Sequence, residues 1–227
     1  ASSGVTNLLV ELATAHVSVE RQTEIIEQIR QIQVNITQHL ACEEQLNTEI
    51  FALLDELKAY AHAQSLNHSL KITDAILSFG EQMSSRIFAQ VLQSIGVNGE
   101  YFDVRSIMKT NSLFGKAVVD IEQLQSNANE LLAPKLTDKV IVTQGFIGQN
   151  DEQETTTLGR GGSDYSAALI AEALSADNLA IWTDVVGIFT TDPRITSQAR
   201  AIKEISFNEA AEMATFGAKI LHPATLI

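Results

Sequence analysis

The sequence predicts an α/β fold with a mainly parallel sheet, and three segments support this prediction. Lys139–Thr143 is a short apolar run rich in β-branched residues, which is typical of a buried parallel strand. Asn178–Asp184 is the next strand candidate, and Tyr165–Leu174, rich in Ala and Leu, reads as a helix between them. Strands that alternate with helices along a chain favour a parallel sheet.

The composition is that of a folded domain. With 227 residues, 45% of them hydrophobic, the chain has ample material for a core in one large domain or two lobes. Only 19% of residues are charged and no long low-complexity segment occurs, which argues against disorder. The net charge is -13, from 28 acidic and 15 basic residues. This balance argues against nucleic acid as a partner, because phosphate contacts need clustered Lys and Arg.

The sequence also bears on the cellular compartment. The single Cys42 excludes a disulfide within the chain and fits a reducing cytoplasm. No apolar run is long enough to cross a bilayer, and no signal peptide precedes the first helix. We therefore expect a cytoplasmic protein without a membrane partner.

The first half of the chain is predicted to be helical. Ser2–Asn7 is a small-residue loop that leads into a helix at Leu8–Ala15. Apolar residues then recur at spacings of three and four on a helix from Glu20 to about Leu40, and again on a second helix that reaches Leu57. The two faces consist of Ile25, Ile29, Ile32, Ile36 and Leu40, and of Leu46, Ile50, Leu53 and Leu57. A coiled-coil interaction module is an alternative, but two short interrupted runs favour ordinary domain helices.

Lys71–Ile95 is another predicted helix, and it contains Gly80 beside Glu81. A glycine inside a helix costs roughly 1 kcal/mol relative to alanine. Its presence indicates a close approach by backbone or by a ligand next to the glutamate. The alternative is a packing notch with Glu81 in solvent.

Further elements follow from local patterns. The polar segment Gln149–Glu154 predicts a hairpin or flap. Gln144-Gly145 and Thr183-Asp184 each follow a predicted strand, and ligands bind beyond the carboxyl ends of parallel strands. The remaining predictions are a strand at Glu100–Val104, a helix at Asp120–Ala133 closed by Pro134, a helix at Phe207–Phe216 and the start of another at Ala218–Ile227.

A glycine-rich stretch, Thr155–Asp164, precedes the predicted helix at Tyr165–Leu174. Its glycines are Gly159, Gly161 and Gly162, which permit unusual backbone angles and a close approach by a ligand. The helix directs free N–H groups and the positive end of its dipole at this loop, which favours an anion there. The alternative is a loop that only turns the chain.

Three polar residues make the anion-binding interpretation specific. Arg160 offers a planar fork of donors suited to a carboxylate or phosphate. Ser163 is predicted to cap the helix, and Asp164 suits its first turn.

Several other chemistries find little support. The chain has no P-loop motif and no protein-kinase catalytic set. Gly159-Arg160-Gly161 opens like a dinucleotide fingerprint, but Asp164 stands at the third glycine position, and Asp184 lies near the place of a ribose-binding acid. Spacing alone therefore does not exclude a dinucleotide-binding site. The five histidines show no metal-ligand spacing, and Cys42 has no activating partner in the sequence.

Taken together, five motifs resemble the aspartokinases of the amino-acid-kinase family in order and spacing. The match extends over essentially the whole chain, including Ser2–Asn7 and Phe79–Glu81, and is nearest to the single-function, lysine-sensitive bacterial type. The motifs are Gln144–Gly148, Thr155–Asp164, Trp182–Asp184, Thr190–Arg194 and Phe216–Pro223.

The resemblance implies a three-layer α/β/α sandwich and a reaction. ATP and L-aspartate give ADP and 4-phospho-L-aspartate, the first step from aspartate to lysine, threonine and methionine. The attacking carboxylate is already ionised at neutral pH, with a reference pKa near 3.9, so no general base is needed. Transfer then depends on positioning and on cancellation of charge at the phosphoryl oxygens. Two alternatives remain: another acidic substrate, such as glutamate or N-acetylglutamate, and a dinucleotide-dependent oxidoreductase.

The resemblance also assigns roles. On the substrate side, Arg160 grips the α-carboxylate of aspartate, Glu81 binds its ammonium group, and Thr6 lies at its polar end. Ser163 and Asp164 are the candidate catalytic residues between substrate and phosphates.

The remaining assignments concern the nucleotide. ATP is the implied cofactor, and it carries the Mg²⁺ ion, so no protein residue is assigned as a metal ligand. The predicted nucleotide-binding residues are Gly161, Gly162, Thr183, Asp184, Arg194 and Lys219.

The chain departs from the family pattern in three ways. Phe189 replaces the usual tyrosine, so no role is assigned to it. The family's first strand, ending in Lys-Phe-Gly-Gly-Thr-Ser, has no counterpart here, and neither do the C-terminal ACT domains that would bind lysine. We expect a partial catalytic domain, incomplete at both ends, with residues 1–138 mainly on the substrate side and 139–227 mainly on the nucleotide side. Such a fragment is expected to show little or no kinase activity alone, whereas the full-length protein is expected to form a homo-oligomer inhibited by lysine.

Overall fold

The computed structural model describes residues 1–40, 43–159, 161–182 and 187–215. Four helices occupy the first part of the chain: α1 (Val5–Leu12), α2 (Val19–Thr37), α3 (Glu43–Leu66) and α4 (Leu70–Ser94). All four were predicted; the bounds of α1, α2 and α4 differ from the prediction by a few residues, whereas α3 continues to Leu66, well beyond the predicted face that ended at Leu57. Serine side chains begin two of them, because Ser18 Oγ accepts from the N–H of Arg21 and Ser69 Oγ from that of Ile72, each at 3.2 Å.

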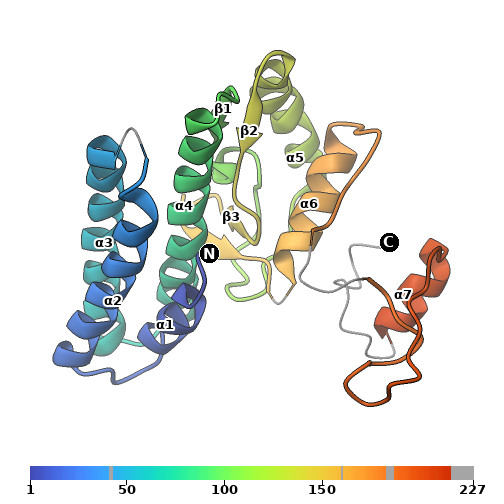
Figure 1. The fold of residues 1–227 in the computed structure, drawn as a ribbon. Helices are drawn as coiled ribbons and strands as arrows, with labels where there is room; N and C mark the ends of the chain where they lie inside the picture. Colours follow the sequence, from blue (N-terminus) through green and yellow to red (C-terminus); the bar gives the residue numbers. More distant parts are fainter. Residues whose placement is uncertain (41–42, 160, 183–186, 216–227) are drawn as a thin grey trace.

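The predicted apolar faces of α2 and α3 bury a shared core with α1 and α4. Ile25, Ile29 and Ile50 are fully buried in it, while Ile36 near the end of α2 is 38% exposed. Figure 1 shows α3 and α4 side by side, with α1 and α2 packed against them. The two amphipathic helices are therefore ordinary helices of the domain in this structure.

The strands are short. β1 (Gly99–Tyr101) pairs in parallel with β2 (Val140–Val142), with Glu100 opposite Ile141. β3 (Ile147–Gln149) pairs antiparallel with β4 (Thr155–Thr157), which confirms the predicted hairpin. The other elements are η1 (Val104–Ser106), α5 (Ile121–Asn127), the π-helical turn η2 (Ala128–Leu132), η3 (Ala133–Thr137), α6 (Gly162–Ala173) and α7 (Phe207–Thr215).

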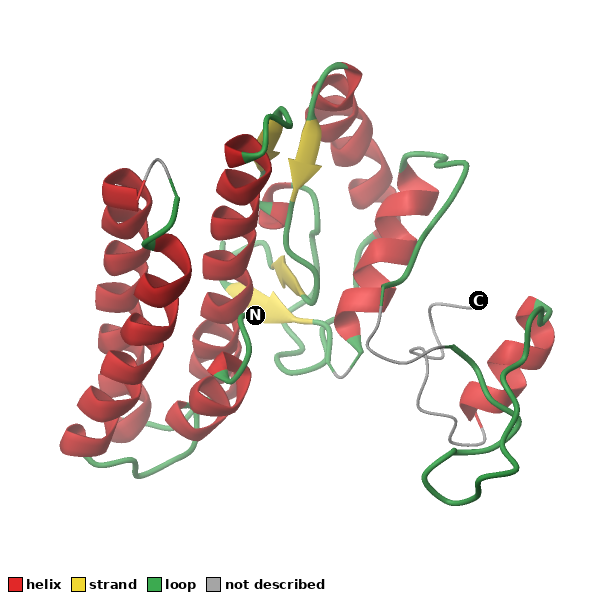
Figure 2. Cartoon of the chain, viewed as in Figure 1, coloured by secondary structure: helices red, strands yellow, loops and turns green. Residues whose placement is uncertain are grey.

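Helices flank the strands on both sides. Figure 1 shows α4 on one side of β1 and β2, and α5 and α6 on the other, and Figure 2 shows the same layers by secondary structure. A second core fills the space between the strands, α5 and α6, with Ile107, Met108 and Ile147 fully buried. This arrangement confirms the predicted α/β fold.

Local predictions were wrong at three places. The strand predicted at Glu100–Val104 ends at Tyr101, because the Asp103 carboxylate accepts from the N–H of Arg105 and begins η1. The helical path also continues through Pro134, which stands at the start of η3, where a missing N–H costs nothing.

The third difference concerns the predicted strands themselves. β2 is parallel as predicted, but it is not buried, since Val140 is 49% exposed. In the segment predicted as a strand at Asn178–Asp184, residues 178–182 have no strand assignment, and residues 183 and 184 lie outside the described part. The predicted helix at Ala218–Ile227 also lies outside it.

Candidate functional site

The candidate site is built around the loop between β4 and α6. Thr155–Thr157, predicted as part of the glycine loop, is the strand β4, so the loop itself is short. Gly159 and Gly161 have φ values of 81° and 76°, in the left-handed region that only glycine adopts readily. These two residues turn the chain out of the strand and into the helix.

Gly161, rather than Ser163, is the N-cap residue of α6, and no side chain caps the helix. Ser163 lies in the first turn and is exposed, so the predicted cap was wrong; Asp164 is in the first turn as predicted. The N–H groups of Ser163 and Asp164 donate to no described residue. Uncapped N–H groups at a helix start favour an anion.

Gly162 has a different function from the other two glycines. It is helical and buried, and a Cβ atom there would lie 3.0 Å from Cδ2 of Phe146 and 3.1 Å from Cβ of Leu158. Its lack of a side chain allows α6 to pack closely on the turn that follows β2.

That turn is fastened to α6. Phe146 has a φ of 71°, which is uncommon for a residue other than glycine. Its N–H donates to Ser166 Oγ at 2.8 Å, and its carbonyl accepts from the N–H of Leu158 at 2.9 Å. A Cβ atom on Gly145 would lie 3.0 Å from Cα of Ser163. The turn, the glycine loop and the start of α6 therefore form one closely packed unit.

Gln144, predicted at the ligand edge of the sheet, has a structural role here. It is buried, and its Oε1 accepts from the N–H of Val104 at 2.9 Å. Its Nε2 donates to Ser85 Oγ at 3.1 Å and to the Tyr101 hydroxyl at 2.8 Å. The side chain thereby joins β1, α4 and η1.

Glu81 lies on α4, and its side chain is partly exposed. Its Oε1 is 2.8 Å from the amino nitrogen of Ala1. Gly80 forms the packing notch that was the alternative to a ligand contact, because a Cβ atom there would lie 2.8 Å from Cβ of Ala1 and 3.0 Å from Cδ1 of Leu9. Thr6 is exposed on α1, the helix that packs on α4 beside this contact.

A buried carboxylate that the sequence analysis missed connects α4 to the glycine loop. Asp74 is fully buried on α4, and its two oxygens accept from Thr157 and Gly115. Burial raises the pKa of the Asp74 carboxyl above its ordinary value, and the hydrogen bonds from Gly115 and Thr157 oppose that shift. An acid within an otherwise apolar stretch of helix was the signal available in the sequence.

Several predicted binding residues lie outside the described part of the chain. They are Arg160, predicted to bind the substrate, and Thr183, Asp184 and Lys219, predicted to bind the nucleotide. Arg194 is described, and its guanidinium forms a two-pronged contact with Asp192 at 2.7 and 3.0 Å. The Asp192 carboxylate raises the pKa of Arg194. The Asp-Pro-Arg segment forms a turn, and no contact between Arg194 and the glycine loop is found among the described residues.

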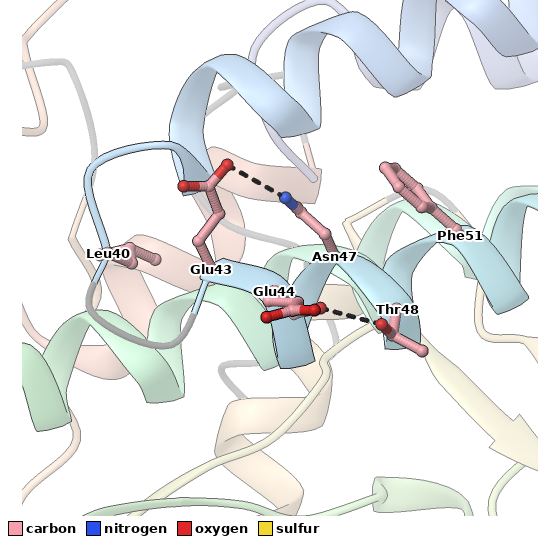
Figure 3. Close-up of a pocket in the computed structure, with 6 residues that line it drawn as sticks. All are labelled: Leu40, Glu43, Glu44, Asn47, Thr48 and Phe51. Atoms are coloured by element: carbon pink, nitrogen blue, oxygen red, sulfur yellow. Dashed lines mark hydrogen bonds between the residues drawn. The ribbon is translucent and has the colours of Figure 1, made fainter.

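An open groove lies elsewhere, at the start of α3 (Figure 3). Glu43 and Glu44 line it, which disfavours an anionic ligand there. None of the predicted site residues lies in it. Its full lining is Leu40, Glu43, Glu44, Asn47, Thr48 and Phe51.

Comparison with known proteins identifies the family of this chain. Residues 1–227 match the amino acid kinase family over their whole length. The chain belongs to this family. It is 50% identical over 227 residues to lysine-sensitive aspartokinase 3 of Escherichia coli, covering 100% of this chain and 50% of that protein. It is 35% identical over 230 residues to an aspartokinase of Chlamydia pneumoniae, covering 100% of this chain and 49% of that protein.

Solved structures agree with the sequence relatives. The crystal structure of E. coli aspartokinase III with aspartate and ADP, described as the R-state, matches with a TM-score of 0.96 and 49% identity, covering 100% of this chain and 51% of that one. The T-state structure of the same enzyme with lysine and aspartate matches with a TM-score of 0.90 and 50% identity, with the same coverage. The resemblance predicted from the motifs is confirmed. The chain spans about half the length of the relatives it matches.

Within residues 1–40, 43–159, 161–182 and 187–215, no helix is long and apolar enough to cross a bilayer.

Proposed function

We propose that the protein containing this chain is an aspartate kinase, which transfers the γ-phosphoryl group of ATP to the side-chain carboxylate of L-aspartate. The products are ADP and 4-phospho-L-aspartate. The observation that carries the proposal is the match, over the full chain at a TM-score of 0.96, to a structure that holds aspartate and ADP.

The substrate is held at its amino-acid end. Glu81 binds the ammonium group and Arg160 the α-carboxylate, while Thr6 contributes a hydroxyl near the same end. Because Glu81 binds the ammonium group and Arg160 binds the carboxylate, the site selects a free amino acid over an N-acylated one, which has no ammonium charge. The side-chain carboxylate of aspartate remains unclamped for attack, and it needs no base because it is already ionised at neutral pH.

The start of α6 stabilises the charge that moves during transfer. The N–H groups of Ser163 and Asp164, which donate to no described residue, supply donors for phosphoryl oxygens, and Gly161 and Gly162 let the backbone approach the phosphate closely. The Ser163 hydroxyl is exposed at this position.

The nucleotide is held by residues from the second half of the chain. Thr183 and Asp184 bind it from one segment, and Arg194 and Lys219 supply positive charge toward its phosphates. Arg194 must exchange its Asp192 partner to do so, since Asp192 occupies the guanidinium in this structure.

Mg²⁺ is proposed to arrive with the nucleotide. In the described part of the chain, no group of three His, Cys, Asp or Glu side chains is arranged to hold a metal ion. Among the described side chains, Asp164 at the start of α6 offers the oxygen donor that Mg²⁺ prefers. When bound, the ion neutralises charge on the phosphates.

Regulation and location are part of the same proposal. Lysine is the proposed feedback inhibitor, because a structure of the E. coli relative contains lysine together with aspartate. The full-length protein is proposed to be a cytoplasmic homo-oligomer whose ACT domains bind lysine, in a pathway that makes lysine, threonine and methionine.

The test is ADP release by the full-length protein with aspartate, glutamate and N-acetylglutamate as acceptors. We expect turnover with aspartate alone and a strongly raised KM for aspartate in Glu81→Gln and Arg160→Ala. Glu44→Gln, in the groove on α3, serves as the charge-matched control and should behave as wild type. Turnover with a different acid would assign another substrate, and NAD binding without ATP binding would favour the oxidoreductase. The chain of residues 1–227 alone is expected to release little or no ADP.

A further inference from the structure

Asp74 makes a buried contact that the proposed mechanism does not use. Its side chain is fully buried, and three hydrogen bonds converge on it. Oδ2 accepts from the N–H of Thr157 at 2.8 Å and from the N–H of Gly115 at 2.9 Å. Oδ1 accepts from the Thr157 hydroxyl at 2.8 Å. A buried carboxylate is costly, and such groups are retained where hydrogen bonds satisfy them.

The three donors belong to segments that lead to the candidate site. Thr157 is the last residue of β4, and Arg160 follows three residues later. Gly115 lies against the glycine loop, because a Cβ atom on Gly159 would be 3.2 Å from the Gly115 carbonyl oxygen. Asp74 therefore accepts hydrogen bonds from two segments that meet at the start of the glycine loop, the end of β4 at Thr157 and the turn at Gly115.

Asp74 also shares a helix face with Glu81. The two residues are seven positions apart on α4, which is close to two helical turns and places both side chains on the same side. One rigid helix thus carries the residue that binds the ammonium group and the residue that holds the loop bearing Arg160.

A second contact fixes the other end of β4 to the same helix. Arg105 Nη1 donates to the Thr155 hydroxyl at 3.0 Å, and its Nη2 donates to Oε1 of Gln82 on α4 at 3.2 Å. Thr156, between the two clamped threonines, points the other way and shares a hydrogen bond of 2.7 Å with the Thr110 hydroxyl. β4 is held against α4 at both ends, and Asp74 holds the end next to the loop.

We propose that Asp74 is a positioning residue that fixes the glycine loop relative to Glu81 and thereby sets the affinity for the amino-acid substrate. The inference rests on the proposed function, because it assigns Glu81 and Arg160 to the two charged groups of one ligand. Asp74 does not touch the substrate. Its loss releases Thr157 at the end of β4, and Gly115 beside Gly159, from α4, so that the start of the glycine loop is no longer fixed relative to Glu81.

The test compares Asp74→Asn and Thr157→Val with Thr37→Val in the full-length protein. Asp74→Asn keeps the shape but has one acceptor oxygen instead of two, so that when the amide oxygen accepts from the two N–H groups the Thr157 hydroxyl faces an NH2 group and loses its acceptor. Thr157→Val removes only the hydroxyl donor. Thr37→Val is the matched control, since Thr37 is also fully buried and donates its hydroxyl to Asn47 Oδ1 at 2.6 Å, between α2 and α3.

The expected result is a split between the two substrates. KM for aspartate should rise by about tenfold or more in Asp74→Asn, because a displacement of about 1 Å at a binding group has effects of this size or larger. Thr157→Val should show a smaller rise in the same direction. KM for MgATP should change less than KM for aspartate in both variants. Thr37→Val should lower the melting temperature and leave both KM values unchanged.

Each other result counts against the inference. If Thr157→Val matches Thr37→Val, with lower stability and an unchanged KM for aspartate, Asp74 is only structural, and this holds even if Asp74→Asn fails to fold. Equal increases of both KM values would also overturn the proposed split. Absence of aspartate phosphorylation in the wild-type protein would overturn the proposed function and this inference together, whereas an active wild type with unaffected variants overturns this inference alone.

Discussion

The hydroxyl oxygen of Ser166 accepts a hydrogen bond from the backbone N–H of Phe146 at 2.8 Å. The same hydroxyl donates to the Gly162 carbonyl at 2.6 Å. Ser166 is 1% exposed, so water does not replace it. Phe146 has a φ of 71°, a conformation that costs a residue with a side chain about 1 kcal/mol or more. One serine therefore holds the turn after β2 in an unfavourable conformation and attaches it to the first turn of α6.

Ser166→Ala should destabilise the protein, because it leaves the partly buried N–H of Phe146 without its acceptor. The expected loss is about 1–3 kcal/mol of the free energy of unfolding, measured by urea denaturation at neutral pH. Ser94→Ala is the control, since that hydroxyl also donates to a backbone carbonyl, that of Val91 at 2.7 Å, but is exposed. The control should change stability by less than about 0.5 kcal/mol. Equal effects of the two substitutions would show that the Phe146 turn does not depend on Ser166.

Gly148→Ala and Gly145→Ala should differ in their effects. A Cβ atom on Gly148 would lie 2.7 Å from both the Met108 carbonyl oxygen and Cγ2 of Thr110, so backbone must move. On Gly145 the nearest atom is Cα of Ser163, at 3.0 Å. Overpacking of this kind costs about 1–3 kcal/mol, and we expect Gly148→Ala to cost more. Gly145→Ala should instead have its larger effect on the rate of ADP release and its smaller effect on the melting temperature, because it displaces the start of α6.

Both glycine variants are checked by thermal unfolding and by ADP release in the full-length protein. Neither residue has a positive φ, so backbone strain does not enter the comparison. A Gly145→Ala protein with wild-type turnover would show that α6 tolerates the displacement, and a reversed order of melting temperatures would contradict the steric argument.

Glu100 makes the stability of the parallel strand pair dependent on pH. Hydrogen bonds from Lys135 and Lys139 lower the pKa of its carboxyl from 4.5 to about 2. Because the folded-state pKa is lowered, the ionised form favours folding. This contribution is fully present above the unfolded pKa of about 4.3 and is lost as the pH falls toward 2.

Glu100→Gln should therefore flatten the fall in unfolding free energy between pH 5 and pH 2, measured by denaturation at a series of pH values. The group is accessible to solvent, so added salt should reduce the difference between variant and wild type. Glu20→Gln, an exposed acid in the first turn of α2, is the control and should leave the slope as in wild type. An unchanged slope in Glu100→Gln would mean that the two lysines do not hold Glu100 in solution.

Much of the helical architecture was predictable because its signal is local. The apolar spacing of α2 and α3 identifies their buried faces, and Gly80 marks the close contact beside Glu81. The pairing of Asp74 with Thr157 was not predictable in this way, because the partners are 83 residues apart. The local sequence also does not show whether an acidic residue on a helix faces solvent or the core. The Ser163 cap failed for a related reason: the left-handed Gly161 moves the helix start two residues earlier. The exposure of Val140 depends on which elements cover β2, and strand propensity carries no information on that.

Leu57→Ala tests whether α2 and α3 are integral to the kinase domain or form a separate interaction module. Leu57 is fully buried among the helices, and its truncation should cost about 2–5 kcal/mol. If the domain is one cooperative unit, the midpoint of helix unfolding, followed by circular dichroism, and the midpoint for loss of nucleotide binding should fall together. Leu66→Ala, at a position 75% exposed on the same helix, should leave both midpoints unchanged. A fall in the helical midpoint alone would identify α2 and α3 as a module that unfolds independently. The packing of α3 along α4, the helix that carries both Asp74 and Glu81, favours a joint fall.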